Sequence, residues 1–96
     1  MIKFENPWLI KVQGEQLVLK FTQQALDELG QLIFLDLPNT GAQLVQGMPC
    51  IGIEATNWIG TSKIPLSGEV ISVNDKVAGL NSRLLTSHDW LLKLKD

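Results

Sequence analysis

The amino-acid sequence predicts a small, mostly β protein, and two observations carry that prediction. Short alternating or apolar runs recur along the chain and are separated, about every 8–12 residues, by glycine, proline and asparagine turn signals, as in small sandwiches and barrels. The chain has 96 residues, 45% of them apolar, which is enough for one compact core but too little for a deep enclosed pocket. We therefore expect a single domain over residues 1–96.

The first third of the chain predicts a hairpin, a short helix and a strand. Residues 8–12 and 15–21 are apolar or alternating runs that flank Gly14, which predicts an antiparallel pair. Thr22 offers an N-cap oxygen and Gly30 a C-terminal stop, so one short helix is expected at about residues 23–29. The next strand, residues 31–37, should end at Pro38, which has no amide hydrogen for the ladder.

The remaining strands are predicted from the same signals, apolar or alternating runs between turn residues. Residues 50–55 and 58–64 predict a second hairpin with Asn57 at its tip, because asparagine tolerates positive φ better than most residues. A further strand covers residues 69–73. The last strand, residues 90–95, is expected to place Trp90, Leu92 and Leu94 on one face and two lysines on the other.

Composition argues against several classes of function. The formal charge is −2 and the sequence shows no clustered basic stripe, so neither nucleic acid nor a membrane surface is an expected partner. Apolar runs are too short to span a bilayer, and residues 1–5 lack a secretory apolar region, which favours a cytoplasmic protein. One cysteine, Cys50, and one histidine leave no internal disulfide and no zinc cluster, so no metal site is expected.

No residue pattern predicts an enzyme. Ser87, His88 and Asp89 are the residue types of a nucleophilic triad, but triad members converge from separate positions and these three are consecutive. Cys50 is expected to be a small core residue, since free cysteine is commonly buried. Trp8 and Trp90 are expected in the core.

Several short stretches of the sequence follow one another in the same order as similar stretches in one known family. They are WLIKVQG at 8–14, FT with AL and LGQLIFLDLP within 21–38, IEA at 53–55, PLSGEV at 65–70, VN at 73–74 and WLLKL at 90–94, with Gly41 and Gly47 between them. Together they resemble the glycine cleavage system H protein family, whose members are lipoyl carriers. The resemblance implies a lipoyl-domain-like barrel-sandwich hybrid of short antiparallel strands.

The same resemblance implies that the lipoyl-lysine position falls on an asparagine. In that family the lysine lies three residues after the glutamate matching Glu54 and eight before the proline matching Pro65, and both counts give Asn57. An asparagine amide cannot form the lipoyl linkage, so no cofactor is expected. The family's C-terminal helical extension also has no counterpart before Asp96.

The expected function is therefore protein binding, by an accessory module linked to glycine cleavage or lipoate metabolism. Its partners would be glycine cleavage or lipoate-attachment enzymes, and the contact surface would be the hairpin tip: Glu54, Thr56, Asn57, Trp58 and Ile59. Trp58 stays open between core packing and partner contact.

The alternative is an active lipoyl or aminomethyl carrier that uses another acceptor lysine. Lys63 is the nearest candidate in sequence. It lies six residues beyond Asn57, so in a strand it would be about 20 Å from the tip. We expect it to be a solvated strand residue.

Overall fold

Two antiparallel sheets form the molecule, and the predicted mostly β architecture is confirmed. The computed structural model describes residues 7–95. Residues 1–6, which include the segment 1–5 expected to lack a secretory apolar region, and Asp96 lie outside the described residues. Sheet A has the strand order β1 (Trp8–Gln13), β2 (Gln16–Phe21), β8 (Leu92–Lys95), β7 (Gly68–Val73), β4 (Gln43–Leu44). Sheet B has the order β3 (Leu32–Asp36), β5 (Pro49–Ala55), β6 (Ile59–Lys63).

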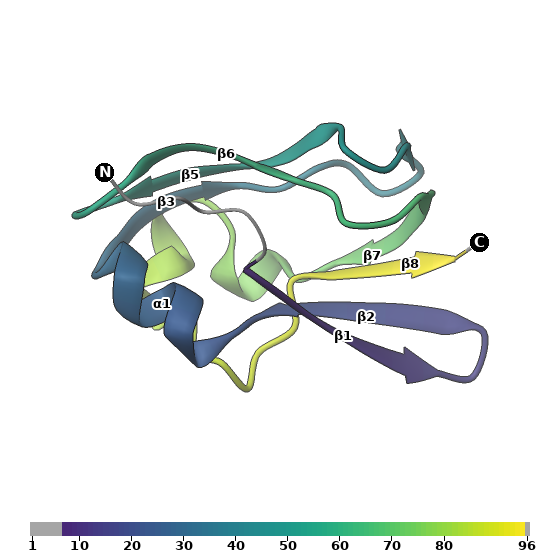
Figure 1. Ribbon diagram of the computed structural model, residues 1–96, viewed down its shortest axis with the longest axis horizontal. Coiled ribbons are helices and arrows are strands. Elements are labelled where there is room, and N and C mark those ends of the chain that lie inside the picture. Colours follow the sequence, from purple (N-terminus) through teal and green to yellow (C-terminus); the bar gives the residue numbers. More distant parts are fainter. Residues whose placement is uncertain (1–6, 96) are drawn as a thin grey trace.

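The sheets lie one above the other, and the helix α1 (Gln23–Leu29) covers one end between them (Figure 1). The β1–β2 hairpin turns at Gly14 with φ 59°, as predicted. The predicted helix also has its expected ends: the Thr22 side chain accepts a hydrogen bond from the amide of Ala25, and Gly30 follows with φ 77°. Local chemistry therefore determines both elements.

Two short 3₁₀ segments and a two-residue strand were not predicted. The 3₁₀ segments are η1 (Asp75–Val77) and η2 (Leu80–Leu84), and they cross beside β3, where Gly79 and Leu35 exchange backbone hydrogen bonds of 2.7 and 3.2 Å. The strand is β4, which pairs with β7. The segment η1 has a capping residue, Asn74, whose side chain accepts a hydrogen bond from the amide of Lys76, but it is only three residues long. The segment η2 has no side-chain cap, and β4 is too short to show alternation.

The core fills the space between the inner faces of the two sheets and α1. Phe21, Leu19 and Leu94 come from sheet A, Ile51 and Ile53 from sheet B. Paired residues in a ladder project to the same face, so the rows Trp8–Phe21 and Leu19–Leu92 both point inward. Leu92 and Leu94, which were predicted to share one face of the last strand, are both fully buried in this core.

Trp8 is a core residue, as predicted. Its side chain is 7% exposed and its ring centroid lies 5.0 Å from that of Phe21. Its indole N–H donates a 3.0 Å hydrogen bond to the carbonyl of Lys63, at the end of β6. Trp8 therefore joins sheet A to sheet B and satisfies its polar atom at the same time.

The prediction that Trp90 is a core residue was wrong. Trp90 is only half-buried, lies outside the core cluster, and carries the Lys93 ammonium 4.6 Å from its ring centroid. The strand alternation does not reach it, because β8 begins at Leu92 and both Leu91 and Leu92 are fully buried. Asn74 holds this segment by bonding the carbonyls of Trp90 and Leu91.

Within residues 7–95, no helix is long and apolar enough to cross a membrane.

Replacing the two tryptophans separately should give unequal losses of stability. Trp8→Ala removes a buried ring and should lower the free energy of unfolding by about 3–5 kcal/mol. Trp90→Ala removes a half-buried ring and one cation–π contact, and should cost less than about 2 kcal/mol. Urea denaturation followed by circular dichroism measures both. Equal losses, or a larger loss for Trp90→Ala, would contradict this assignment of the core.

Candidate functional site at the β5–β6 tip

The β5–β6 hairpin places Asn57 in its connecting loop, as predicted. The ladder runs from the Pro49–Lys63 pair to the Glu54–Ile59 pair, and the amide of Ala55 donates to the carbonyl of Trp58 at 2.9 Å. Asn57 is exposed. The expected reason for asparagine here was wrong, however, because no non-glycine residue in the described range has positive φ.

Asn57 instead serves as a cap for the C-terminus of α1. Its backbone amide donates to the carbonyl of Leu29 at 3.0 Å, and its side-chain amide donates to the carbonyl of Glu28 at 3.3 Å. The last carbonyls of a helix have no donors within the helix. Asn57 therefore supplies, from a distant hairpin, the donors that α1 lacks.

Thr56 and Gly30 complete this docking of the tip. The amide of Thr56 donates to the carbonyl of Gln31 at 3.0 Å, and the amide of Gln31 donates back to the Thr56 hydroxyl at 3.0 Å. A Cβ atom at Gly30 would collide with the Thr56 hydroxyl and would lie 2.8 Å from Nδ2 of Asn57. Glycine is thus required both by its φ and by the closeness of the tip.

Trp58 and Ile59 face opposite sides of the hairpin. The Trp58 ring covers Gly60, where an added Cβ would lie 2.9 Å from ring carbons, and it packs half-buried against the core. Ile59 is 74% exposed. Of the two residues, Ile59 is the one available for partner contact.

Three exposed side chains form a row across the outer face of sheet B beside the tip. Phe34 pairs with Glu54, and Glu54 pairs with Ile59. Because ladder partners project to the same face, all three side chains point outward, and each is exposed. We call these residues the tip row. The sequence analysis missed Phe34, whose presence on this surface follows only from the register of β3 on β5.

Lys63 lies at the far end of the same hairpin. Lys63 pairs with Pro49 and is exposed at the last position of β6, whereas the tip adjoins the first position of that strand. Its carbonyl is occupied by the Trp8 indole. These positions agree with the expectation of a solvated strand residue remote from Asn57.

The remaining candidates for chemistry lie apart from the tip. Cys50 packs half-buried against the core, and burial raises the pKa of its thiol to about 12, although a backbone hydrogen bond from Ile51 lowers it in part. The thiol is therefore protonated and weakly nucleophilic at neutral pH. The Asp89 carboxylate accepts hydrogen bonds from the amide and hydroxyl of Thr86, so it closes the turn at residues 86–89.

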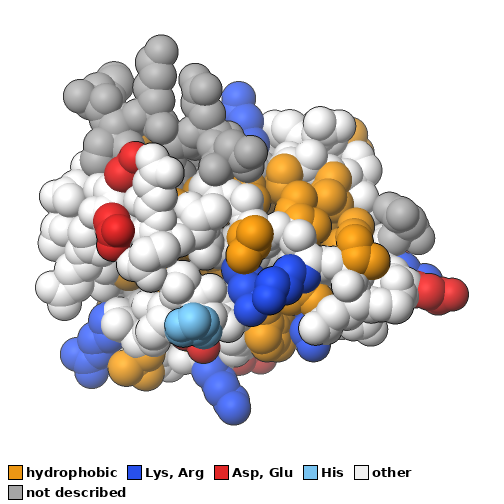
Figure 2. All heavy atoms as spheres, turned by 60° about the horizontal axis from the view of Figure 1, so that its bottom comes forward, with side chains coloured by type: hydrophobic (Ala, Val, Ile, Leu, Met, Phe, Trp, Pro, Cys, Tyr) orange, Lys and Arg blue, Asp and Glu red, His pale blue; other side chains and the backbone are white. Residues whose placement is uncertain are grey.

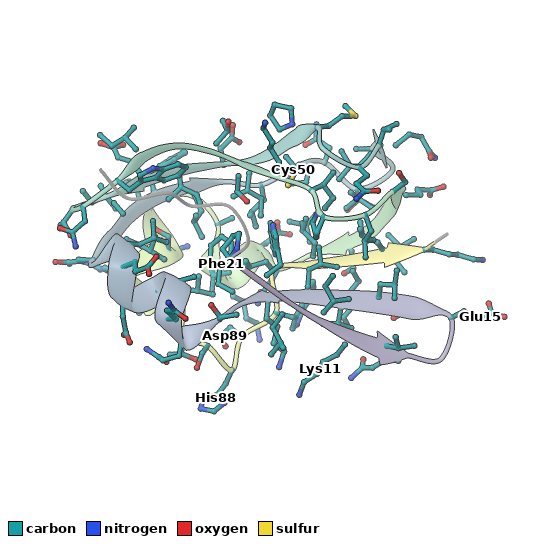
Figure 3. The ribbon with its side chains drawn as sticks, viewed as in Figure 1. Lys11, Glu15, Phe21, Cys50, His88 and Asp89 are labelled. Atoms are coloured by element: carbon teal, nitrogen blue, oxygen red, sulfur yellow. The ribbon has the colours of Figure 1, made fainter. Side chains whose placement is uncertain are left out.

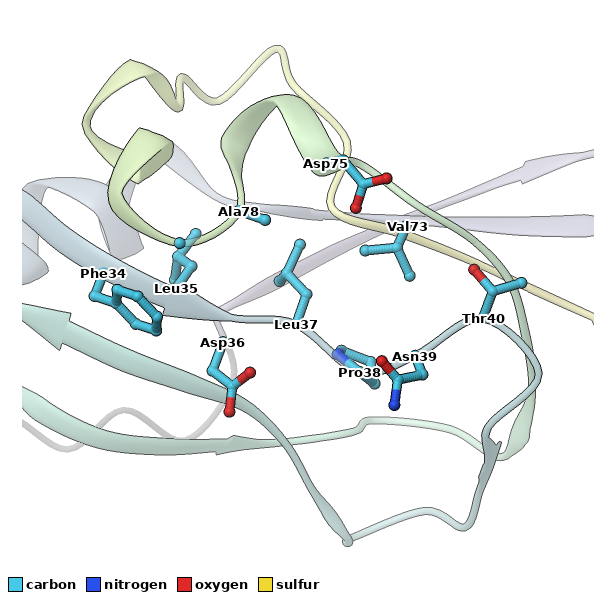
Figure 4. Close-up of a pocket in the computed structure, with 11 residues that line it drawn as sticks. Phe34, Leu35, Asp36, Leu37, Pro38, Asn39, Thr40, Val73, Asp75 and Ala78 are labelled. Carbon is cyan, nitrogen blue, oxygen red and sulfur yellow. The ribbon is translucent and has the colours of Figure 1, made fainter.

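A shallow cavity of about 330 Å³ lies between the end of β3 and η1 (Figure 4). Two carboxylates, Asp36 and Asp75, line it from opposite sides, with Leu37 between them. Within the described residues, no group of three or more potential ligands could hold a metal ion.

The fold of the described residues defines a class of small domain with two antiparallel sheets and one short helix. The crystal structure of a glycine cleavage system H protein from Mycobacterium marinum has the same fold, with a TM-score of 0.72 and 25% identity over 83% of this chain and 65% of that one. A family model described as glycine cleavage H-protein matches residues 2–96. The chain belongs to the glycine cleavage H-protein family.

Individual members of this family are 30–34% identical in sequence to this chain. The glycine cleavage system H protein of Bartonella quintana is 30% identical over 93 residues, which cover 94% of this chain and 75% of that protein. The one from Salmonella typhimurium is 32% identical and covers 95% and 73%. The match to the Bacillus cytotoxicus protein, 34% identical, covers 77% of this chain and only 58% of the relative.

Gly30→Ala tests whether the tip depends on its close approach to α1. The variant should lower the free energy of unfolding by about 2–4 kcal/mol, because backbone strain of about 1–3 kcal/mol adds to displacement of the tip. Gly14→Ala is the matched control: its φ is also positive, but nothing lies within 4 Å of the added Cβ. Urea denaturation measures the free energy, and the NMR shift of the Asn57 side-chain amide reports the contact. Equal losses with an unmoved Asn57 resonance would contradict the docking.

Proposed function

We propose that this chain is an H-protein-like module that is not lipoylated and acts by binding a protein partner. Two lines support the proposal. The resemblance implies, from the spacing to Glu54 and Pro65, that Asn57 stands at the family's lipoyl-lysine position. The Asn57 side-chain amide also donates to the Glu28 carbonyl at the helix end.

Asn57 does not fit the lipoyl group. Lipoyl attachment needs a free amine that becomes acylated, and the nitrogen of an asparagine side chain is already part of an amide. The nitrogen also donates to a carbonyl, in a contact that holds the tip against α1. A side chain fixed in this way supplies rigidity to the tip, whereas a carrier needs a long side chain that moves.

The tip row gives the proposed partner surface its chemistry. Phe34 is 40% exposed and Ile59 is 74% exposed, and Glu54 lies between them in the ladder. Exposed apolar side chains on a rigid hairpin are typical anchors in protein interfaces. Of the tip residues expected to form the surface, Glu54 and Ile59 face outward. Thr56 and Asn57 hold the loop, and Trp58 supports it from the inner side.

The proposed partners are enzymes of glycine cleavage or of lipoate attachment, in the cytoplasm. The names of the relatives support the first group, since each is a glycine cleavage system H protein. The alternative of a carrier that uses Lys63 has less support, because that lysine lies at the opposite end of β6 from the tip.

Exposure to a lipoate-attaching enzyme, ATP and lipoate should leave the native chain at its unmodified mass, whereas Asn57→Lys should gain one lipoyl increment. The new amine stands on an exposed loop three residues after Glu54. Adding Trp58→Ala to Asn57→Lys should not speed the reaction, since the Trp58 ring lies against Gly60 and packs on the core. Intact mass spectrometry measures all of these proteins.

Asn81→Lys is the matched control, because Asn81 is also an exposed asparagine in a loop-like segment, within η2. A lipoylated lysine in the native chain would refute loss of the carrier role. If Asn57→Lys folds normally and is not modified while an H protein that carries the acceptor lysine is, the assignment of Asn57 to the carrier position fails.

A charge placed on the tip row should weaken partner binding. Ile59→Asp should reduce affinity for a purified glycine cleavage or lipoate-attaching enzyme by about tenfold or more, the effect of losing one apolar anchor. Val45→Asp is the control, since Val45 is 61% exposed outside the tip row. Biolayer interferometry measures each affinity. Equal weakening by both variants, or no binding by the native chain to any of these enzymes, would contradict the proposed surface.

A further inference from the structure

The outer face of sheet A concentrates basic side chains that are scattered in the sequence. Four of the eight basic residues lie on β1, β2 and β8. The ladders pair Lys11 with Val18 and Val18 with Lys93, so these side chains share one face. Lys20, two residues after Val18 on β2, projects to the same face. These lysines are far apart in the sequence and come together only through the register of the three strands.

We call Lys11, Lys20 and Lys93, with Val18 between them, the lysine triad. Strand spacing places the Cα atoms of Lys11 and Lys93 about 10 Å apart and that of Lys20 about 7 Å from Val18. Val18 is only 3% exposed although it lies on an outer face, which is consistent with long lysine stems covering it. The Lys11 side chain points away from sheet B (Figure 3).

The ammonium groups of the triad have no carboxylate partner in the described part of the chain. Lys20 donates to the carbonyl of His88 at 3.1 Å, and Lys93 lies over the Trp90 ring. Lys95, the fourth basic residue of this face, differs because it pairs across the ladder with Glu69. The triad is thus a local positive surface on a chain whose formal charge is −2.

Apolar side chains border the triad. Leu9, paired with Lys20, is 43% exposed, and Trp90 is half-buried under Lys93. Figure 2 shows basic and apolar side chains side by side on the face that carries the histidine. Aromatic side chains are enriched in protein interfaces, and polar and charged side chains form the solvent-accessible rim around their apolar part.

We propose that the lysine triad is a docking surface for an acidic patch on a partner protein. Charge complementarity argues for carboxylates as the counterpart. A polyphosphate or an anionic membrane fits less well, because both require a wider positive field, and the net negative charge of this chain opposes long-range attraction to them. The triad lies on sheet A and the tip row on sheet B, so this proposal is independent of the tip.

Neutralising the triad tests the proposal. The probe is a short poly-glutamate peptide titrated into the isotope-labelled chain at low salt, with amide shifts recorded by NMR. Shifts should concentrate in β1, β2 and β8. Lys11→Gln with Lys20→Gln and Lys93→Gln should weaken binding by about tenfold or more, as the combined loss of three surface ion pairs predicts. Added salt should weaken it as well.

The control variant is Lys63→Gln with Lys76→Gln, which removes two exposed lysines from other faces and should leave the affinity within about twofold, since exposed charges away from a contact contribute little. Lys11→Glu alone keeps the test valid if the triple variant is unstable, because the Lys11 side chain has no hydrogen-bond partner among residues 7–95. Equal or tighter binding of duplex DNA or phosphatidylserine vesicles to the triad would overturn the assignment to a protein partner. Absence of peptide binding, or shifts on another face, would overturn the surface itself.

Discussion

The hydrogen bonds between the β5–β6 tip and the end of α1 are the contact on which the arrangement of the two sheets depends. Helix α1 follows directly from sheet A, and the tip belongs to sheet B. Asn57 satisfies two carbonyls of α1, and Thr56 exchanges two hydrogen bonds with Gln31, the residue just before β3. The contact also explains Gly30, the position where the chain leaves the helix and has no room for a side chain. One small polar junction thus closes this end of the core.

The sequence predicted those parts of the fold that local chemistry determines. Thr22 and Gly30 marked the helix, Gly14 marked the first hairpin, and both appear as expected. Trp90 was misplaced because the strand alternation was extended two residues too far, past a segment that Asn74 holds from elsewhere in the chain. The positive-φ explanation for Asn57 failed for a similar reason, since its role depends on a helix about 30 residues earlier in the sequence.

The candidate surfaces were harder to predict than the strands, because both depend on register. Phe34 joins Glu54 and Ile59 only through the pairing of β3 with β5, and Lys11 joins Lys93 only through Val18 on β2. Neither set is close in sequence. The position of Asn57, by contrast, followed from counting residues along a single hairpin. Under the proposed function, this member of the H-protein family has a fixed tip in place of a mobile acylated side chain. Two separate faces, the tip row and the lysine triad, are proposed for contact with proteins.

Hydrogen exchange of the loop amides tests the central claim, that the tip is fixed to α1, most directly. The amides of Thr56 and Asn57 donate to the carbonyls of Gln31 and Leu29, so both should exchange slowly, with protection similar to that of amides in β5. A mobile carrier-like loop would instead exchange at the rate of an unstructured peptide. Native-state exchange followed by NMR distinguishes the two. Protection at both amides supports the account, and unprotected exchange at Asn57 in a folded chain would contradict it.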